Sequence, residues 1–168
     1  MQAELQERYH IETQLRQVIE GTAAFTGQAF FPALVRHIAE ALGIRYVMVS
    51  QAVEAGFQVL AFYADGELRP PLFLPYEAVP CCRQSFQTGR CCHPANLQTL
   101  YPDQALFAEL DAESYLGVGL RNAAGEATGN LCILHDHPLA DPAWTETLLS
   151  IFASRAGSEL ERLVPLRR

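Results

Sequence analysis

The sequence predicts an α+β domain, with an antiparallel sheet of five or six strands and helices packed on both faces of that sheet. The main observation is a pair of apolar runs, 114–121 and 127–135, on either side of a polar turn from Asn122 to Gly125, which is the pattern of a β-hairpin. Short alternating runs upstream and a helical repeat near each end of the chain complete the pattern. Because 49% of the 168 residues are hydrophobic, one domain with a sizeable core is expected.

The hairpin should form the centre of the sheet. Its strands contain glycines at 117, 119 and 129. Because a glycine inside a strand usually marks a bulge or a close approach of another segment, we expect such a contact here.

A helix is expected over residues 2–25, where an apolar stripe recurs at helical spacing. The stripe comprises Ile11, Leu15, Val18, Thr22 and Phe25. A stripe this narrow suits a partner helix better than a sheet, so we interpret it as a coiled-coil-like dimer seam. The alternative is that the helix packs against its own domain.

A second helix should begin between Gln28 and Phe31, with Pro32 in its first turn and Gly43 as its C-terminal stop. Its apolar face is broad, and we expect that face to lie on the sheet. The face comprises Phe31, Leu34, Val35, Ile38 and Leu42.

Strands are predicted at 44–50 and 57–63, which are rich in branched and aromatic residues and are followed by turn sequences. The run 68–74 contains Pro70 and Pro71. Since proline cannot donate a hydrogen bond to a neighbouring strand, any strand there should be short and at an edge.

The segment 75–112 is the least regular part of the sequence. Within it we expect, in order, a short helix from Pro80 to Gly89, a strand at 90–94, a loop at 96–103 and a short helix at 104–110. Long irregular segments inside compact domains often carry function, so a binding site is expected here.

A long final helix is expected after the hairpin. Asp141 is a good N-cap and Pro142 suits the first helical position. Pro165 should end the helix near Leu163, because the residue before a proline disfavours the helical conformation.

Composition excludes several functional classes. The formal charge of −7 and the lack of a basic cluster argue against nucleic-acid binding. No apolar run approaches the roughly 20 residues that span a bilayer, and the polar N-terminus is unlike a signal peptide. Five cysteines without signs of secretion suggest reduced thiols, and we expect a cytoplasmic protein.

The hairpin also resembles a known family. Residues 115–121, Tyr-Leu-Gly-Val-Gly-Leu-Arg, and 129–134, Gly-Asn-Leu-Cys-Ile-Leu, are similar to the last two central strands of GAF domains, which are regulatory modules of sensor proteins. The resemblance extends to 30–44, to 81–101, and to 138–142 with the helix that follows. It implies a GAF/PAS-like fold.

The resemblance divides the chain into an N-terminal signalling and dimerisation helix at 1–25, a GAF domain at 26–163 and a tail at 164–168. It implies a sensory domain that is not itself an enzyme and that regulates an output domain of a histidine kinase or a diguanylate cyclase. The two amphipathic end helices, at 5–25 and 141–163, predict a homodimer in which they pair as a bundle. The alternative is a domain that only dimerises and binds no ligand.

A pocket for a small ligand is expected in the irregular segment, because aromatic side chains with a few polar groups line such sites. The identity of the ligand and any cofactor is unknown from sequence. The predicted ligand-binding residues are Tyr76, Cys82, Arg83, Phe86, His93, Tyr101, Phe107 and Tyr115, with Asp103 as a further polar candidate. Equally, these aromatic residues could simply fill the core.

The cysteines suggest an alternative. Cys81 and Cys91, like Cys82 and Cys92, are ten residues apart, a spacing similar to that of the free methionine-(R)-sulfoxide reductases, which are GAF proteins that use thiols. The Gly-His-Ile-Ala-Cys-Asp motif of that family is absent at 108–113. That omission removes the expected nucleophile, so no catalytic residue is assigned.

No metal site is predicted. Adjacent cysteines point apart, particularly in a strand, and zinc sites usually use a Cys-x-x-Cys spacing. Cys82, Cys92 and Cys132 are therefore interpreted as small buried apolar residues. His135 and His137 could share a face, but we interpret them as surface residues of a turn.

Overall fold

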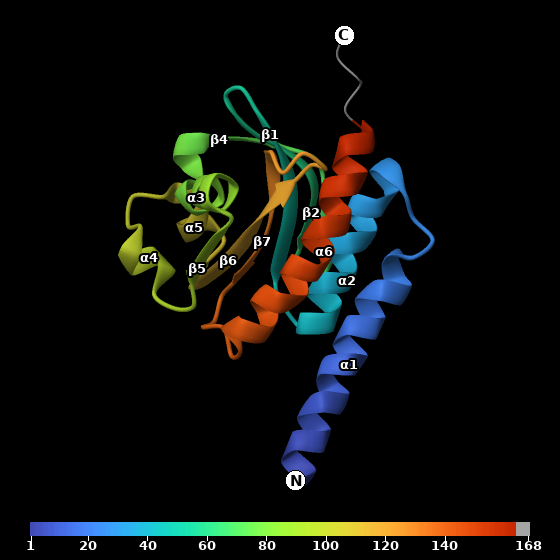
Figure 1. Ribbon diagram of the computed structural model, residues 1–168. Helices are drawn as coiled ribbons and strands as arrows, with labels where there is room; N and C mark the ends of the chain where they lie inside the picture. Colours follow the sequence, from blue (N-terminus) through green and yellow to red (C-terminus); the bar gives the residue numbers. More distant parts are fainter. Residues whose placement is uncertain (164–168) are drawn as a thin grey trace.

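A seven-stranded antiparallel sheet separates two layers of helices in the computed structural model, which describes residues 1–163 (Figure 1). The strand order is β3-β2-β1-β7-β6-β5, with β4 also paired to β2. The strands are β1 (Tyr46–Val53), β2 (Gly56–Ala64), β3 (Glu67–Arg69), β4 (Phe73–Pro75), β5 (Arg90–His93), β6 (Ser114–Arg121) and β7 (Ala127–His135). The predicted tail at 164–168 lies outside the described residues.

The hairpin β6–β7 lies in the middle of the sheet, as predicted, because β1 pairs with the free side of β7 and β5 with the free side of β6. The sheet has seven strands, one more than the six that were the upper limit of the prediction. Pro70 and Pro71 split the expected edge strand into β3 and β4, and both short pieces pair with β2.

One face of the sheet is covered by α2 (Phe30–Leu42) and α6 (Pro142–Leu163), and α1 (Gln2–Thr22) packs on α2. A short 3₁₀ turn, η1 (Gly27–Ala29), joins α1 to α2. The predicted caps are confirmed: Gly43 ends α2 in the left-handed conformation with φ of 65°, and the Asp141 carboxylate accepts a hydrogen bond from the Trp144 N–H at 3.1 Å.

The opposite face carries η2 (Tyr76–Ala78), α3 (Pro80–Thr88), α4 (Leu97–Leu100) and α5 (Ala105–Glu109) (Figure 1). Gly89 ends α3 with φ of 100°, as the sequence predicts. The loop expected at 96–103 instead contains α4. Asn96 starts that turn in the left-handed conformation with φ of 61°, which asparagine tolerates better than most residues.

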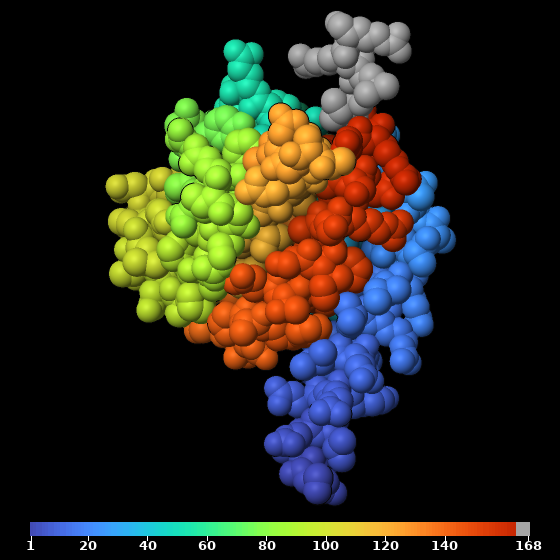
Figure 2. Space-filling model, in the orientation of Figure 1, coloured from blue at the N-terminus to red at the C-terminus, as the bar shows by residue number. Residues whose placement is uncertain are grey.

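The apolar stripe of α1 is used differently from the predicted dimer seam. The helix ends at Thr22 rather than near residue 25, and Val18 and Thr22 are fully buried against the chain's own core. The first half of α1 extends beyond the body of the domain (Figure 2). Val18 and Thr22 therefore pack within the domain, which was the alternative interpretation, whereas Phe25 is 41% exposed.

Among residues 1–163, no helix combines the length and the apolar character that crossing a bilayer requires.

The contact between α6 and β6 generates a stability prediction. A Cβ atom at Gly157 would overlap the carbonyl oxygen of Arg121. Replacing a helical glycine by alanine normally stabilises a helix by about 1 kcal/mol, but here the collision should reverse the sign. We expect Gly157→Ala to lower the free energy of unfolding by about 1–3 kcal/mol, measured by urea denaturation.

The matched control is Ser158→Ala, one residue further along α6, where the side chain is exposed. Its effect should stay within about 0.5 kcal/mol. A Gly157→Ala variant that is more stable than the wild type would show that α6 does not approach β6 this closely.

Candidate functional site

Helix α3 lies directly against β6, and the glycines of β6 make this possible. A Cβ at Gly117 would collide with the side chains of Tyr115 and Ser85, and one at Gly119 would lie 2.8 Å from the backbone oxygen of Ser85. The expectation that these strand glycines mark a close approach is therefore confirmed. The approach buries the inner face of α3, which includes Cys81, Cys82 and Ser85.

A buried chain of hydrogen bonds connects α3 to three strands. The Ser50 hydroxyl donates to Asn130 Oδ1 at 2.8 Å, and Asn130 Nδ2 donates to the Tyr115 hydroxyl at 3.2 Å. That hydroxyl lies 3.2 Å from the hydroxyl of Ser85 and donates to the sulfur of Cys82 at 3.4 Å. Each of these polar groups thus has a partner, as burial requires.

The Cys82 and Cys132 thiols meet at the α3 end of this chain, with their sulfur atoms 3.9 Å apart. Both side chains are buried, as predicted for structural cysteines. Burial also raises the pKa of the Tyr115 hydroxyl well above its usual value, so the phenol is neutral at physiological pH.

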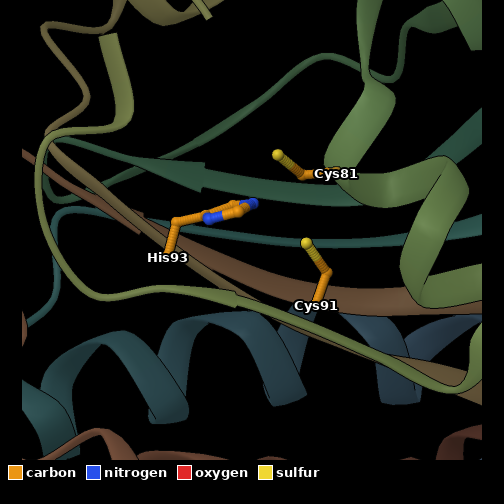
Figure 3. Close-up of side chains that lie close together, drawn as sticks. All are labelled: Cys81, Cys91 and His93. Atoms are coloured by element: carbon orange, nitrogen blue, oxygen red, sulfur yellow. The ribbon is translucent and has the colours of Figure 1, made fainter. Parts of the chain in front are cut away.

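A second cluster joins α3 to β5. Figure 3 shows the sulfur atoms of Cys81 and Cys91 and the imidazole of His93 directed toward one another. One ligand atom from each of the three residues lies within 4.8 Å of the other two. The Tyr101 hydroxyl is 3.1 Å from His93 Nε2, and the two rings meet edge to face with centroids 5.4 Å apart.

The pKa values in this cluster follow from burial and from the thiol pair. A hydrogen bond with Cys81 lowers the pKa of the Cys91 thiol and raises that of Cys81. Burial lowers the pKa of His93, which favours the neutral imidazole, and raises the pKa of Tyr101 to about 12. The cluster therefore offers sulfur and nitrogen lone pairs rather than positive charges.

Sequence reasoning paired Cys81 with Cys91 only as thiols of a sulfoxide reductase, and it missed the cluster as a metal site because it judged metal binding from adjacent cysteines alone. Cys91 and Cys92 do point to opposite faces: Cys91 joins the core under α3, and Cys92 packs against the core under the long helices. The available signal was the alternation of β5, which places Cys91 and His93 on one face. Only the tertiary fold adds Cys81 to them.

The eight predicted ligand-binding residues fall into three groups. Cys82, Phe107 and Tyr115 are buried in the core, at 3%, 1% and 0% exposure. His93 and Tyr101 are half-buried at the Cys81–Cys91 cluster. The remaining three form the group described next.

Tyr76, Arg83 and Phe86 gather at the outer side of α3. The Tyr76 and Phe86 rings are stacked with centroids 6.5 Å apart, and the Arg83 guanidinium lies 5.9 Å from the centre of Tyr76. Asp103, the further polar candidate, is exposed and lies between α4 and α5. A ligand role for any of these residues stays a prediction.

Comparison with known proteins identifies the fold. The family model described as "GAF domain" matches residues 26–160. The chain matches no curated protein. Among solved structures, the GAF domain of a phosphoenolpyruvate-protein phosphotransferase from Coxiella burnetii superposes with a TM-score of 0.71 at 18% identity, covering 92% of this chain and 94% of that one.

Two further structures have the same fold. The chromophore-binding domain of Stigmatella aurantiaca phytochrome P1 has a TM-score of 0.66 at 11% identity, covering 88% of this chain and 58% of that one. Free methionine-R-sulfoxide reductase from Neisseria meningitidis, determined with its substrate, has a TM-score of 0.65 at 17% identity, covering 90% of this chain and 91% of that one.

The reductase corrects one prediction. We expected the chain not to be an enzyme by itself because its sequence resembles a regulatory module. The Neisseria protein is an enzyme, and its fold coincides with this one over 90% of the present chain. The expectation that the chain is not an enzyme was therefore wrong, because this fold also occurs in an enzyme.

Proposed function

Because this chain belongs to the GAF domain family, we propose that it is a sensory domain that binds a small ligand on the α3–α5 side of its sheet. The observation that carries the proposal is the division made by the sheet. Aromatic, thiol and other polar side chains gather around α3, whereas the long helices α1, α2 and α6 occupy the opposite face. The binding of a chromophore by the Stigmatella domain supports a small-molecule ligand.

The hairpin β6–β7 provides the route from ligand to output in this proposal. On one face, α3 contacts it through Ser85 and Tyr115, at 3.2 Å between hydroxyl oxygens. On the other face, Gly157 of α6 lies against the backbone of Arg121. A ligand that displaces α3 would therefore move strands that also support α6, and we propose that α6 relays this change to an output domain of the histidine kinase or diguanylate cyclase type.

We also propose a homodimer formed by the end helices. The stripe predicted for this role is partly used within the domain, but α1 keeps other apolar side chains in solvent. Leu5, Tyr9 and Ile19 are 57%, 73% and 48% exposed, and Ile151 on α6 is 45% exposed. Pairing of α1 and α6 between two copies would cover them, as in a helical bundle.

A second candidate function is a thiol-dependent sulfoxide reductase. The observation that favours it is the closeness of the Cys81 and Cys91 sulfur atoms, which lie within 4.8 Å of each other, together with the fold of the Neisseria enzyme. The Cys91 thiolate would attack the sulfoxide sulfur, and after uptake of protons the sulfide leaves and Cys91 becomes a sulfenic acid. The Cys81 thiol would then displace water to form a disulfide, which an external dithiol would reduce.

The ligand prediction uses the exposed residue Arg83. Native mass spectrometry of the purified chain should show a small molecule bound to the wild type. Arg83→Ala should bind that molecule at least about 10-fold more weakly, because the change removes a cation–π contact and a charged contact to the ligand. The melting temperature should not change, because Arg83 is a surface residue.

Arg36→Ala is the matched control, since Arg36 is equally a surface residue but lies on α2 and pairs with Glu40. It should keep the bound mass. A wild-type chain that carries no bound molecule, or an Arg83→Ala variant that retains it fully, would contradict the proposed site.

The reductase prediction compares two adjacent cysteines. If the second candidate holds, free methionine sulfoxide should be consumed in the presence of dithiothreitol. Cys91→Ser should then lower the rate of sulfoxide consumption at least about 100-fold, because it removes the thiolate that attacks the sulfoxide sulfur. Cys92→Ser, which changes the opposite face of β5, should keep the wild-type rate. A wild-type chain with no turnover would eliminate this function.

The dimer prediction is tested by light scattering at high micromolar concentration. The wild type should have twice the mass of one chain, and Ile19→Glu should shift it toward the monomer, because it places a charge in the apolar contact. Leu68→Glu on β3 is the control, since Leu68 is also 48% exposed but lies on a different element. A wild-type monomer at this concentration would refute the dimer.

A further inference from the structure

We propose that Cys81, Cys91 and His93 form a zinc-binding site that fastens α3 to β5. The three side chains come from two separate elements and converge on one point (Figure 3). The two cysteines are buried, at 0% and 2% exposure, and His93 is half-buried. The proposal stands apart from the sensory function, because a zinc site here would hold the fold whether or not a further ligand binds.

The distances are close to those of a zinc site. Zinc binds cysteine sulfur at about 2.3 Å and histidine nitrogen at about 2.0–2.1 Å, so ligand atoms around a tetrahedral ion are roughly 3.5–3.8 Å apart. The ligand atoms of the three residues already lie within 4.8 Å of one another. A movement of about 1 Å, within the reach of small side-chain rotations, would complete the geometry.

The donor set and the charge balance select the metal. Two thiolates and an imidazole suit zinc better than calcium or magnesium, which prefer oxygen ligands. Two thiolates also cancel the double positive charge of Zn²⁺, so the loaded site is neutral overall. Neutrality matters because the cysteines are buried, and an uncompensated charge there would be costly.

Tyr101 supplies the fourth polar group. Its hydroxyl lies 3.1 Å from His93 Nε2. Three protein ligands leave one position on a tetrahedral zinc ion, which a water or the Tyr101 hydroxyl would fill in this proposal.

A second group of potential ligands, His135, Asp136 and His137, makes a useful contrast. The Asp136 carboxylate is already paired with the Arg45 guanidinium at 3.1 Å, and His135 Nδ1 accepts a hydrogen bond from the Arg45 backbone N–H at 3.2 Å. A cation there would displace existing partners and meet a positive charge. In the Cys81–Cys91–His93 cluster, the hydrogen-bond partner of His93 is the neutral Tyr101 hydroxyl, so an ion would displace a neutral group there and not a member of an ion pair.

The test starts from the full chain, reduced and stripped of metal with a chelator. Titration with Zn²⁺ against a chromophoric chelator should give one ion per chain. Co²⁺, used as a coloured substitute for zinc, should give visible bands of tetrahedral intensity and a near-ultraviolet absorption from thiolate bound to cobalt. Cys81→Ser or Cys91→Ser should each remove about half of that ultraviolet intensity, because one of two thiolates is lost.

Each of these variants should also weaken zinc binding more than about 100-fold, since even the outer partners of metal ligands are worth about 10- to 100-fold. His93→Gln should weaken it similarly, and because His93 is only half-buried it gives a variant that folds even if a buried serine does not. Cys92→Ser is the matched control, and its zinc affinity should equal that of the wild type. Circular dichroism verifies the fold of each variant.

Three results would overturn the proposal. The first is a wild-type chain that binds no zinc at micromolar concentration. The second is a Cys91→Ser variant that is folded and binds zinc as tightly as the wild type. The third is a loss of binding on Cys132→Ser without a loss on Cys91→Ser, which would place the metal at the other thiol pair.

Discussion

The close approach of α3 to β6 is the constraint on which the rest of this structure depends. Side chains at Gly117 and Gly119 would force the helix away from the strand. With hydrogen atoms there, the Ser85 hydroxyl comes within 3.2 Å of Tyr115, and Cys82 comes within 3.9 Å of Cys132. The same approach places Cys81 above β5, next to Cys91 and His93. Two glycines in one strand therefore set the position of every thiol on α3.

The sheet makes the two helical layers depend on each other. Strand β6 contacts α3 on one face and α6 on the other, and neither contact leaves room for adjustment, because Gly119 and Gly157 both lie against backbone atoms. Packed interiors respond to strain by moving as units rather than by local compression. A shift of α3 is therefore expected to reach α6 through the backbone of the hairpin, which is the property a relay requires.

Local sequence signals predicted most of the fold, and tertiary contacts account for what they missed. The hairpin, the glycine stops of α2 and α3 and the proline-split edge depend on backbone conformation near the residue concerned, so sequence determines them directly. The use of the α1 stripe depends on whether Val18 meets its own core or a second chain, which periodicity does not distinguish. The Cys81–Cys91–His93 cluster needs the packing of α3 on β5, so spacing along the chain could not reveal it.

The two proposed uses of Cys81 and Cys91 exclude each other, because each requires both sulfur atoms. A zinc ion between them would hold the sulfurs apart and keep both as thiolates, whereas a disulfide would draw them together and remove their charge. Cys81 belongs to α3 and Cys91 to β5, so the chemical state of the pair sets how closely the helix lies on this strand. Helix α3 also contacts Tyr115 in β6, because the Ser85 and Tyr115 hydroxyl oxygens lie 3.2 Å apart. A change in the state of the thiol pair would therefore shift this contact in the centre of the sheet. The cluster thus lies where a change in metal or redox state could alter the same contact that positions the α3 layer.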